Sequence, residues 1–152
     1  MSTPNVSADL VWEIVRSQNS YLVKRTKNAK VQFSRDPLNL TNVHSRKYAG
    51  FVNDKALGVV ANKEGGVQVI SKTKAANKPA SGQVTSNQGA NKSARKTYRS
   101  VATMVAKSGY RADLRAAAVS RASAIRRSQR PVKPDHEVKL RGKAAQKAAE
   151  SS

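Results

Sequence analysis

The sequence contains no cysteine and only seven Trp, Tyr and Phe residues. The absence of cysteine excludes disulfides and thiolate metal sites. Val, Ile, Leu and Phe make up 29 of the 152 residues, a share of about 19% that, with high net charge, is typical of disordered chains. The chain also lacks an apolar N-terminal signal region and any apolar run approaching about 18 residues. We therefore expect an intracellular protein that does not insert into a membrane.

Acidic residues are scarce as well. Nine Asp and Glu residues stand against 29 Lys and Arg residues, so the formal net charge is +20 and the isoelectric point is near 10.9. Such a charge opposes compaction unless a polyanion neutralises it. The composition therefore predicts a nucleic acid as partner, with an anionic membrane surface as the weaker alternative.

Apolar residues and charge are distributed unevenly along the chain. Residues 1–70 hold 20 of the 29 Val, Ile, Leu and Phe residues, with 10 basic and 5 acidic residues. Residues 71–152 hold the other 9, with 19 basic and 4 acidic residues. We expect the first part to bury a small core, whereas the second part is suited to meeting an anion.

The groups that support catalysis or metal binding are missing or isolated. His44 and His136 are the two histidines and lie 92 positions apart, a spacing that favours surface or RNA-contacting roles over a metal site. Gly65 and Gly66 read as a hairpin turn, without the Lys-Ser/Thr of a phosphate-binding loop. The carboxylates are too scattered for a paired or two-metal site. We expect no enzyme activity, no cofactor, no metal and no small-molecule substrate.

The N-terminal part has the pattern of one helix and several short strands. Ser7 is a favoured N-cap, so a helix is predicted to begin there and to continue through Val15. Residues 20–24 and 31–33 are strand candidates on either side of a basic loop. The segments KYAGFV, LGVVA and VQVIS within 48–71 alternate with Asn, Asp and Gly turns, which favours an antiparallel meander of three strands.

The C-terminal part changes character. Residues 72–91 are rich in Lys, Ser, Asn and Gly and predict a linker or arm without packed structure. Helical periodicity follows over 92–108 and 112–128, separated by Gly109. The tail 131–152 begins with two prolines in four residues and is expected to be disordered, with a transient helix near 142–149.

These elements predict an α+β fold with a short N-terminal helix, a small antiparallel sheet, a basic helical hairpin and an extended C-terminal tail. The expected division is a small α+β core over 1–71, a basic linker over 72–91, the hairpin over 92–130 packed on the core, and the tail over 131–152.

A helical wheel separates apolar and charged sides of the hairpin. In the first helix Ala94, Tyr98, Val101 and Val105 share one face. In the second helix the predicted apolar face comprises Tyr110, Leu114, Ala117, Ala118, Ala124 and Ile125. Ala122 falls among the arginines at the adjacent edge, and Arg121 falls inside the apolar face.

Residues 110–131 carry six arginines and one aspartate. A solvated helix face usually mixes charges of both signs in pairs three or four residues apart. The imbalance favours polyanion contact over a solvated face, since the planar guanidinium can bond two phosphate oxygens. Trp12, Phe33, Tyr48 and Phe51 could stack on bases, but their spacing favours a role in the small core.

Three segments resemble the eukaryotic-type ribosomal protein L twenty-eight family of the large ribosomal subunit. They are VWEIVRSQNSYLVKR at 11–25, DPLNLTNVHSRKYAGFV at 36–52 and YRADLRAAAVSRASAIRRSQRPV at 110–132. The resemblance extends over about 7–132. The linker and the tail depart from it, and Ala112 stands where the family usually has Pro.

The resemblance implies a non-catalytic component of the large subunit, docked on ribosomal RNA beside neighbouring ribosomal proteins. It implies a cytoplasmic protein that passes through the nucleus and nucleolus during assembly. The RNA contacts that it carries over are Lys24, Arg25, Arg111, Arg115, Arg121, Arg126 and Arg127. Further RNA contacts are predicted from side-chain chemistry alone: Lys27, Lys30, Arg46, Lys47, Lys92, Arg95, Lys96, Arg99 and Arg130.

Two other functions fit the charge less well. A nucleolar or chromatin architectural protein would match the Lys/Ala-rich tail, but the arginines lie in patterned helices, which favours a shaped RNA surface. A membrane-surface helix would need bulky apolar residues opposite the charge, and 112–128 offers mostly alanine.

Overall fold

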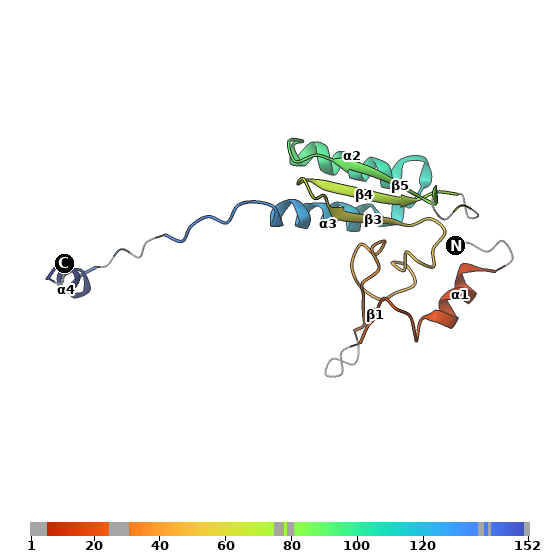
Figure 1. The fold of residues 1–152 in the computed structure, drawn as a ribbon, viewed down its shortest axis with the longest axis horizontal. Coiled ribbons are helices and arrows are strands. Elements are labelled where there is room, and N and C mark those ends of the chain that lie inside the picture. Colours follow the sequence, from red (N-terminus) through yellow and green to blue (C-terminus); the bar gives the residue numbers. More distant parts are fainter. Residues whose placement is uncertain are drawn as a thin grey trace.

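The computed structural model describes residues 6–24, 31–74, 78, 81–136, 139 and 141–150. Figure 1 shows a body in which two long helices accompany a three-stranded sheet, an N-terminal part beside it, and a C-terminal tail that extends away from it. The helices and strands are α1 (Ala8–Val15), β1 (Leu22–Val23), β2 (Phe33–Ser34), β3 (Leu57–Ala61), β4 (Val67–Lys72), β5 (Gln83–Gln88), α2 (Ala94–Ala106), α3 (Arg115–Ser128) and α4 (Lys143–Glu150). Short 3-10 turns at Lys107–Gly109 and Ala112–Leu114 join α2 to α3. The predicted α+β fold is confirmed.

Helix α1 begins where the sequence predicts. The Ser7 hydroxyl accepts a hydrogen bond from the Leu10 amide at 3.2 Å, which satisfies a backbone donor that the first helical turn leaves unpaired. Trp12 is the buried residue of the helix. It packs with Ala49 and Val52 in a small core of the N-terminal part.

The predicted strands on either side of the basic loop are short. Leu22 pairs with Ser34 and Val23 pairs with Phe33 in an antiparallel two-residue ladder. The connecting residues 25–30 lie outside the described residues, and the predicted contacts Arg25, Lys27 and Lys30 lie there with them.

The prediction of a strand at the start of the meander is wrong. Residues 48–52 form turns, and side chains hold their backbone in that shape. The Asn53 amide donates to the carbonyl of Ala49 at 2.9 Å, and a carboxylate oxygen of Asp36 accepts the Phe51 amide at 2.9 Å. Because these side chains satisfy the backbone groups locally, the segment needs no neighbouring strand.

The third strand of the sheet comes instead from the predicted linker. Residues 83–88 form β5, which pairs antiparallel with β4 from Lys72↔Gln83 to Val67↔Gln88, while β3 pairs with the other edge of β4. The expectation of unpacked structure is wrong for this segment. Its side chains are mostly polar because β5 is an edge strand with much exposed surface, so the ladder to β4 rather than apolar burial places it.

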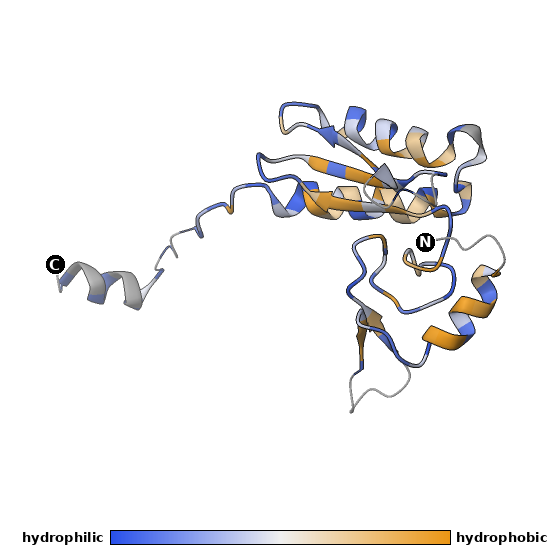
Figure 2. Ribbon diagram, turned by 45° about the vertical axis from the view of Figure 1, so that its right-hand side comes forward, coloured by the Kyte–Doolittle hydropathy of each residue, from blue (hydrophilic) through white to orange (hydrophobic). Residues whose placement is uncertain are grey.

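Helices α2 and α3 pack on the sheet as an antiparallel hairpin, as predicted. The Ser93 hydroxyl accepts from the Lys96 amide at 3.4 Å at the start of α2. The larger core consists of Leu40, Leu57, Val59, Val67, Val69, Val101, Val105, Leu114, Ala118 and Ala122. In Figure 2 the apolar colours are strong in β3 and β4, α1, α2 and α3 carry both apolar and hydrophilic colours, and the start of the tail is mostly hydrophilic.

The buried stripe of α3 is shifted from the predicted wheel. Ala122 is fully buried, although the wheel placed it among arginines, and Ala124 is exposed, although the wheel placed it in the core. Leu114, Ala118 and Ala122 are four residues apart and form the contact line with α2 and the sheet. Small residues on this line let the helix backbone approach its neighbours closely.

The tail is drawn away from the body in Figure 1. Residues 131–136 are exposed and have no regular secondary structure. A helix near 142–149 was predicted, and α4 spans Lys143–Glu150. Disorder of the tail in solution stays a prediction.

Candidate nucleic-acid interface

The predicted RNA-contacting residues that the structure describes fall into two groups. The side chains of one group contact backbone carbonyls, carboxylates, amides or rings elsewhere in the chain, and those of the other group extend into solvent. This difference decides which guanidinium groups have all their donors available for phosphate.

Arg121 belongs to the first group. Its Nε donates to the Val59 carbonyl at 2.7 Å, and one terminal nitrogen lies 3.2 Å from the Leu40 carbonyl and 3.1 Å from Asn42 Oδ1. Burial lowers the pKa of the Arg121 guanidinium from its ordinary value. Arg121 therefore joins α3 to the edge strand β3 and to the loop before it.

Arg111 joins the interhelical turn to the N-terminal part. One terminal nitrogen donates to the Lys55 carbonyl at 2.8 Å, and the other donates to the Lys47 carbonyl at 3.1 Å. Asp113 holds the same guanidinium through two hydrogen bonds of 2.9 and 2.8 Å. The hydrogen bond from Arg111 lowers the pKa of the Asp113 carboxyl below its ordinary range.

Arg126 joins the end of α3 to the turn before α2. Its two terminal nitrogens donate to the carbonyls of Ala90 at 2.9 Å and Lys92 at 3.0 Å. The Lys92 ammonium in turn donates to Gln88 Oε1 at 2.6 Å.

Two of the predicted contacts in the N-terminal part also have partners. Arg46 bonds Asp9 at 2.8 Å and also bonds the side chain of Asn53. Asp9 is 85% exposed, so this surface ion pair contributes little to stability. The Lys47 ammonium lies 5.5 Å from the centre of the Tyr48 ring, within the range of a cation–π contact.

The second group lies on the helical hairpin, and we call it the outward cation set. It consists of Arg95, Lys96 and Arg99 on α2, Arg115 and Arg127 on α3, and Arg130 just after α3. All six are exposed. The hydrogen bonds and ion pairs within the described residues involve none of these six side chains. Lys24 is exposed as well, but it lies in the N-terminal part.

A groove runs between α2 and α3. It has a volume of about 940 Å³ and is lined by Tyr98, Arg99, Ala102, Thr103, Ala106, Lys107, Arg115, Ala116 and Val119. Its lining combines small side chains with three cations, and no acidic residue is among the nine. Lys107 lines the groove but was not among the predicted RNA contacts, although it falls near the end of the predicted helix 92–108.

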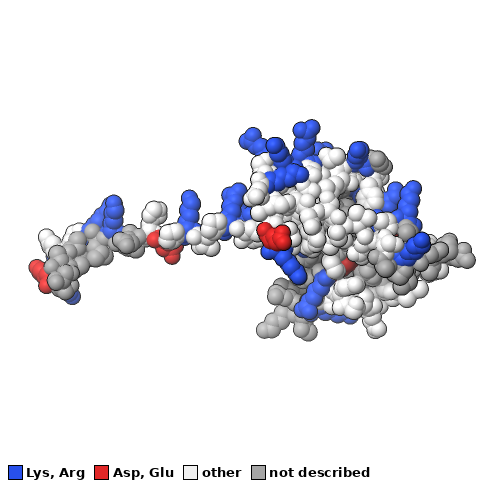
Figure 3. Space-filling model, turned by 45° about the horizontal axis from the view of Figure 1, so that its top comes forward, with Lys and Arg blue, Asp and Glu red and all other residues white. Residues whose placement is uncertain are grey.

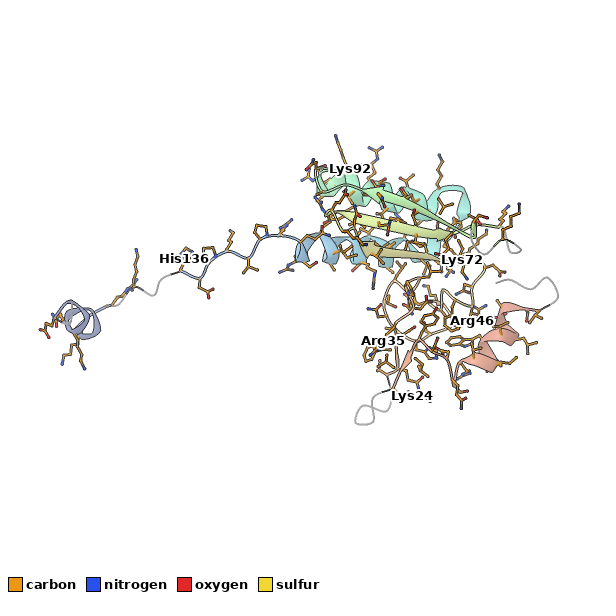
Figure 4. All side chains as sticks on the ribbon, viewed as in Figure 1. Lys24, Arg35, Arg46, Lys72, Lys92 and His136 are labelled. Atoms are coloured by element: carbon orange, nitrogen blue, oxygen red, sulfur yellow. The ribbon has the colours of Figure 1, made fainter. Side chains whose placement is uncertain are left out.

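The predicted basic residues do not converge on one point. Figure 4 shows Lys92 near one end of the helix and sheet layer and Lys24 at the far side of the N-terminal part. Figure 3 shows Lys and Arg side chains around the body and along the tail, with few acidic residues on the visible face. Positive charge is therefore spread over much of the molecule, and the outward cation set is the group of exposed cations that two packed helices hold together.

Lys72 was not predicted as a functional residue and has a structural role. Its ammonium donates to the carbonyls of Asn53 at 2.8 Å and Phe51 at 3.4 Å. Burial lowers the pKa of Lys72, while Asp36 and Asp54 act in the opposite direction.

The aromatic and histidine residues are mostly used in packing. Trp12 is buried and its ring centre lies 4.8 Å from that of His44, whose Nε2 is 2.8 Å from the Arg16 carbonyl oxygen. Phe51 packs against Tyr21, and Tyr48 is partly buried against the larger core. Phe33 differs, since 40% of it is exposed.

Two other kinds of site are absent from the described part of the chain. It contains no group of three or more His, Cys, Asp or Glu residues placed to hold a metal ion. It also contains no helix that is both long and apolar enough to cross a membrane.

Comparison with known proteins identifies the class. A sequence model described as the Ribosomal L28e protein family matches residues 10–128. "Large ribosomal subunit protein eL28" of Schizosaccharomyces pombe is 46% identical over 131 residues, which cover 85% of this chain and 97% of the relative. The protein of the same name in Dictyostelium discoideum is 34% identical over 129 residues, covering 84% and 92%. That of Trypanosoma cruzi is 40% identical over 76 residues, covering 49% of each chain.

These matches, together with the α+β fold and its basic hairpin, define a ribosomal protein. The chain belongs to the Ribosomal L28e protein family. The resemblance inferred from three segments of the sequence is confirmed.

Proposed function

We propose that this chain is a structural constituent of the large ribosomal subunit, that it binds ribosomal RNA, and that it supports subunit assembly and translation without catalysing a reaction. Support comes from relatives that carry the name of a large-subunit protein over nearly their full length. We further propose that the chain resides in cytoplasmic ribosomes and reaches them by way of the nucleolus. Neighbouring ribosomal proteins would be its further partners.

The observation that carries RNA binding is the outward cation set. Exposed arginines from two packed helices present planar, permanently charged donors at fixed positions, which suits phosphate better than a flexible ammonium does. Release of counterions from the RNA supplies most of the affinity. The shape of folded RNA, read by a rigid hairpin and by extended arms, supplies the specificity.

The C-terminal tail that follows the hairpin also has a part in this proposal. Residues 131–136 are exposed and basic residues continue beyond them. A chain segment of this composition buries too little apolar surface to order by itself and gains order when RNA neutralises it. We therefore include the tail as an arm that orders on binding.

Sedimentation of an epitope-tagged chain in a sucrose gradient tests the proposal. The tagged chain should sediment with large subunits and 80S ribosomes and should stay with them through a wash at moderate salt. A chain that stays at the top of the gradient, or that fractionates with chromatin, contradicts the ribosomal assignment and favours a nuclear architectural role.

A further inference from the structure

The groove between α2 and α3 has an unusual lining for a protein contact. Four of its lining residues are small or aliphatic, and we call them the floor: Ala102, Ala106, Ala116 and Val119. Three cations are also part of the lining. Arg99 belongs to α2 and Arg115 to α3, so positive charge stands on both walls. Lys107 adds a third cation where α2 ends.

Packing explains why the groove stays open on this side. Val101, Val105 and Leu114 are buried in the core. Between the exposed cations the two helices present mainly alanine to the groove, so the groove floor lies close to both backbones. Such a floor is apolar, but its short side chains form few pockets into which the side chains of an apolar partner could pack.

Charge complementarity selects the occupant. Neither wall carries a carboxylate, and Arg99 and Arg115 make no hydrogen bond or ion pair within the described residues. Guanidinium groups on two facing walls suit a strand that carries a phosphate at every nucleotide. Tyr98 is partly buried against the larger core, and the part of its ring that lines the same groove can contact a base.

We propose that this groove binds an unstacked nucleotide of a single-stranded or bulged RNA segment. Arg99, Lys107 and Arg115 contact the phosphates on either side, while the ribose and base lie on the alanine floor beside Tyr98. This inference rests on the proposed RNA-binding function and adds the form of RNA that is read. An A-form duplex keeps its bases stacked and cannot insert one into the groove.

Filling the floor tests the groove without changing any charge. The full-length Ala116→Leu variant is compared with Ala124→Leu, which adds the same side chain at an exposed position of α3 outside the groove. The probes are a fluorescent oligouridylate of about 12 nucleotides and an RNA duplex of equal phosphate number, with affinity measured by fluorescence anisotropy. Thermal unfolding followed by circular dichroism verifies that both variants are folded.

We expect Ala116→Leu to bind the oligouridylate about tenfold more weakly than the wild type, with duplex binding unchanged, and Ala124→Leu to bind both probes as the wild type does. Arg115→Gln should weaken binding of both probes, because it removes a phosphate contact. If Ala116→Leu alters stability, ultraviolet cross-linking of wild-type protein to the oligouridylate gives a second test, with uridine expected on Tyr98.

Two results would overturn the groove assignment. Equal oligouridylate affinity for Ala116→Leu and wild type, or cross-links confined to residues outside the groove, would place the RNA on other cations and leave the RNA-binding function intact. If Ala116→Leu weakens the binding of polyglutamate but leaves oligouridylate binding unchanged, the occupant of the groove is an acidic protein segment. Failure of the wild type to bind either RNA would instead contradict the proposed function itself.

Discussion

Arg121 on α3 donates a 2.7 Å hydrogen bond from Nε to the main-chain carbonyl of Val59 in β3. Strand β3 is an edge strand, so carbonyls on its outer side have no partner strand. Val59 is fully buried, and a buried carbonyl without a hydrogen-bond partner is costly. An arginine that the helical wheel places in an apolar face thus satisfies a buried carbonyl at the sheet edge.

The first prediction concerns this hydrogen bond. Arg121→Met keeps much of the side-chain volume but leaves the Val59 carbonyl without this donor, so the free energy of unfolding should fall by about 1–3 kcal/mol. Arg121→Lys should recover part of the loss, since an ammonium cannot reproduce the fork that reaches Val59, Leu40 and Asn42 together. Urea unfolding measures both variants. The control Arg127→Met, at an exposed position, should stay within about 0.5 kcal/mol of the wild type; an equal effect at both positions would contradict the structural role of Arg121.

A second prediction concerns close packing at Gly58. A Cβ atom added there would lie 2.2 Å from the Pro37 carbonyl oxygen, so Gly58→Ala should force the loop away from β3 and lower stability by about 1–3 kcal/mol. Gly89 is the matched control, because a Cβ atom added there meets nothing within 4 Å. Thermal unfolding of the two variants should separate them clearly. Similar midpoints would mean that the 37–38 loop does not lie against β3.

A third prediction uses the partly buried phenol of Tyr110. Its hydroxyl lies 3.0 Å from the Ala56 carbonyl oxygen and 2.8 Å from the Lys72 carbonyl oxygen, and burial raises the pKa of Tyr110 above 10.0. Because the pKa of Tyr110 is higher in the folded than in the unfolded state, the protonated phenol contributes its full share to the free energy of unfolding below pH 10. That contribution is lost as the pH rises through the folded-state pKa. In a spectrophotometric titration the latest tyrosine ionisation should disappear in Tyr110→Phe and persist in Tyr48→Phe. A late ionisation that survives in Tyr110→Phe would assign it elsewhere.

A fourth prediction separates the outward cation set from cations that have partners in the fold. Each phosphate contact contributes about 0.7–0.9 to the slope of log affinity against log salt concentration. Changing Arg115 and Arg127 together to glutamine should therefore flatten the slope for ribosomal RNA by about 1.5. Arg16 pairs with Glu13 at 3.0 Å on α1, and Arg16→Gln should leave the slope unchanged. An unchanged slope in the double variant would place both arginines in solvent.

Local sequence signals were sufficient for the helices. Ser7 before α1 and the apolar periodicity of the hairpin are properties of neighbouring residues, and the helices form close to where these properties predict them. The β3 and β4 strands follow for the same reason, since alternation between turn residues is a local pattern.

Two elements could not be predicted in this way. The segment 48–52 has strand-forming residues, yet Asn53 and Asp36 satisfy its backbone in turns. The segment 83–88 has the composition of a linker, yet the unpaired edge of β4 makes it a strand. In both, the partner that decides the backbone conformation is a group outside the segment.

The sequence by itself determined that this protein carries a large positive charge concentrated in its C-terminal half, that a basic helical hairpin holds much of it, and which family it resembles. It did so because charge, periodicity and motif are properties of the chain order. Only the tertiary structure decided which arginines face outward. Arg111, Arg121 and Arg126 reach carbonyls that folding brings near them, whereas Arg95, Arg99, Arg115 and Arg127 extend into solvent. The reason is physical: folding must bring residues 34 to 81 positions apart together before these guanidinium groups can donate to the carbonyls.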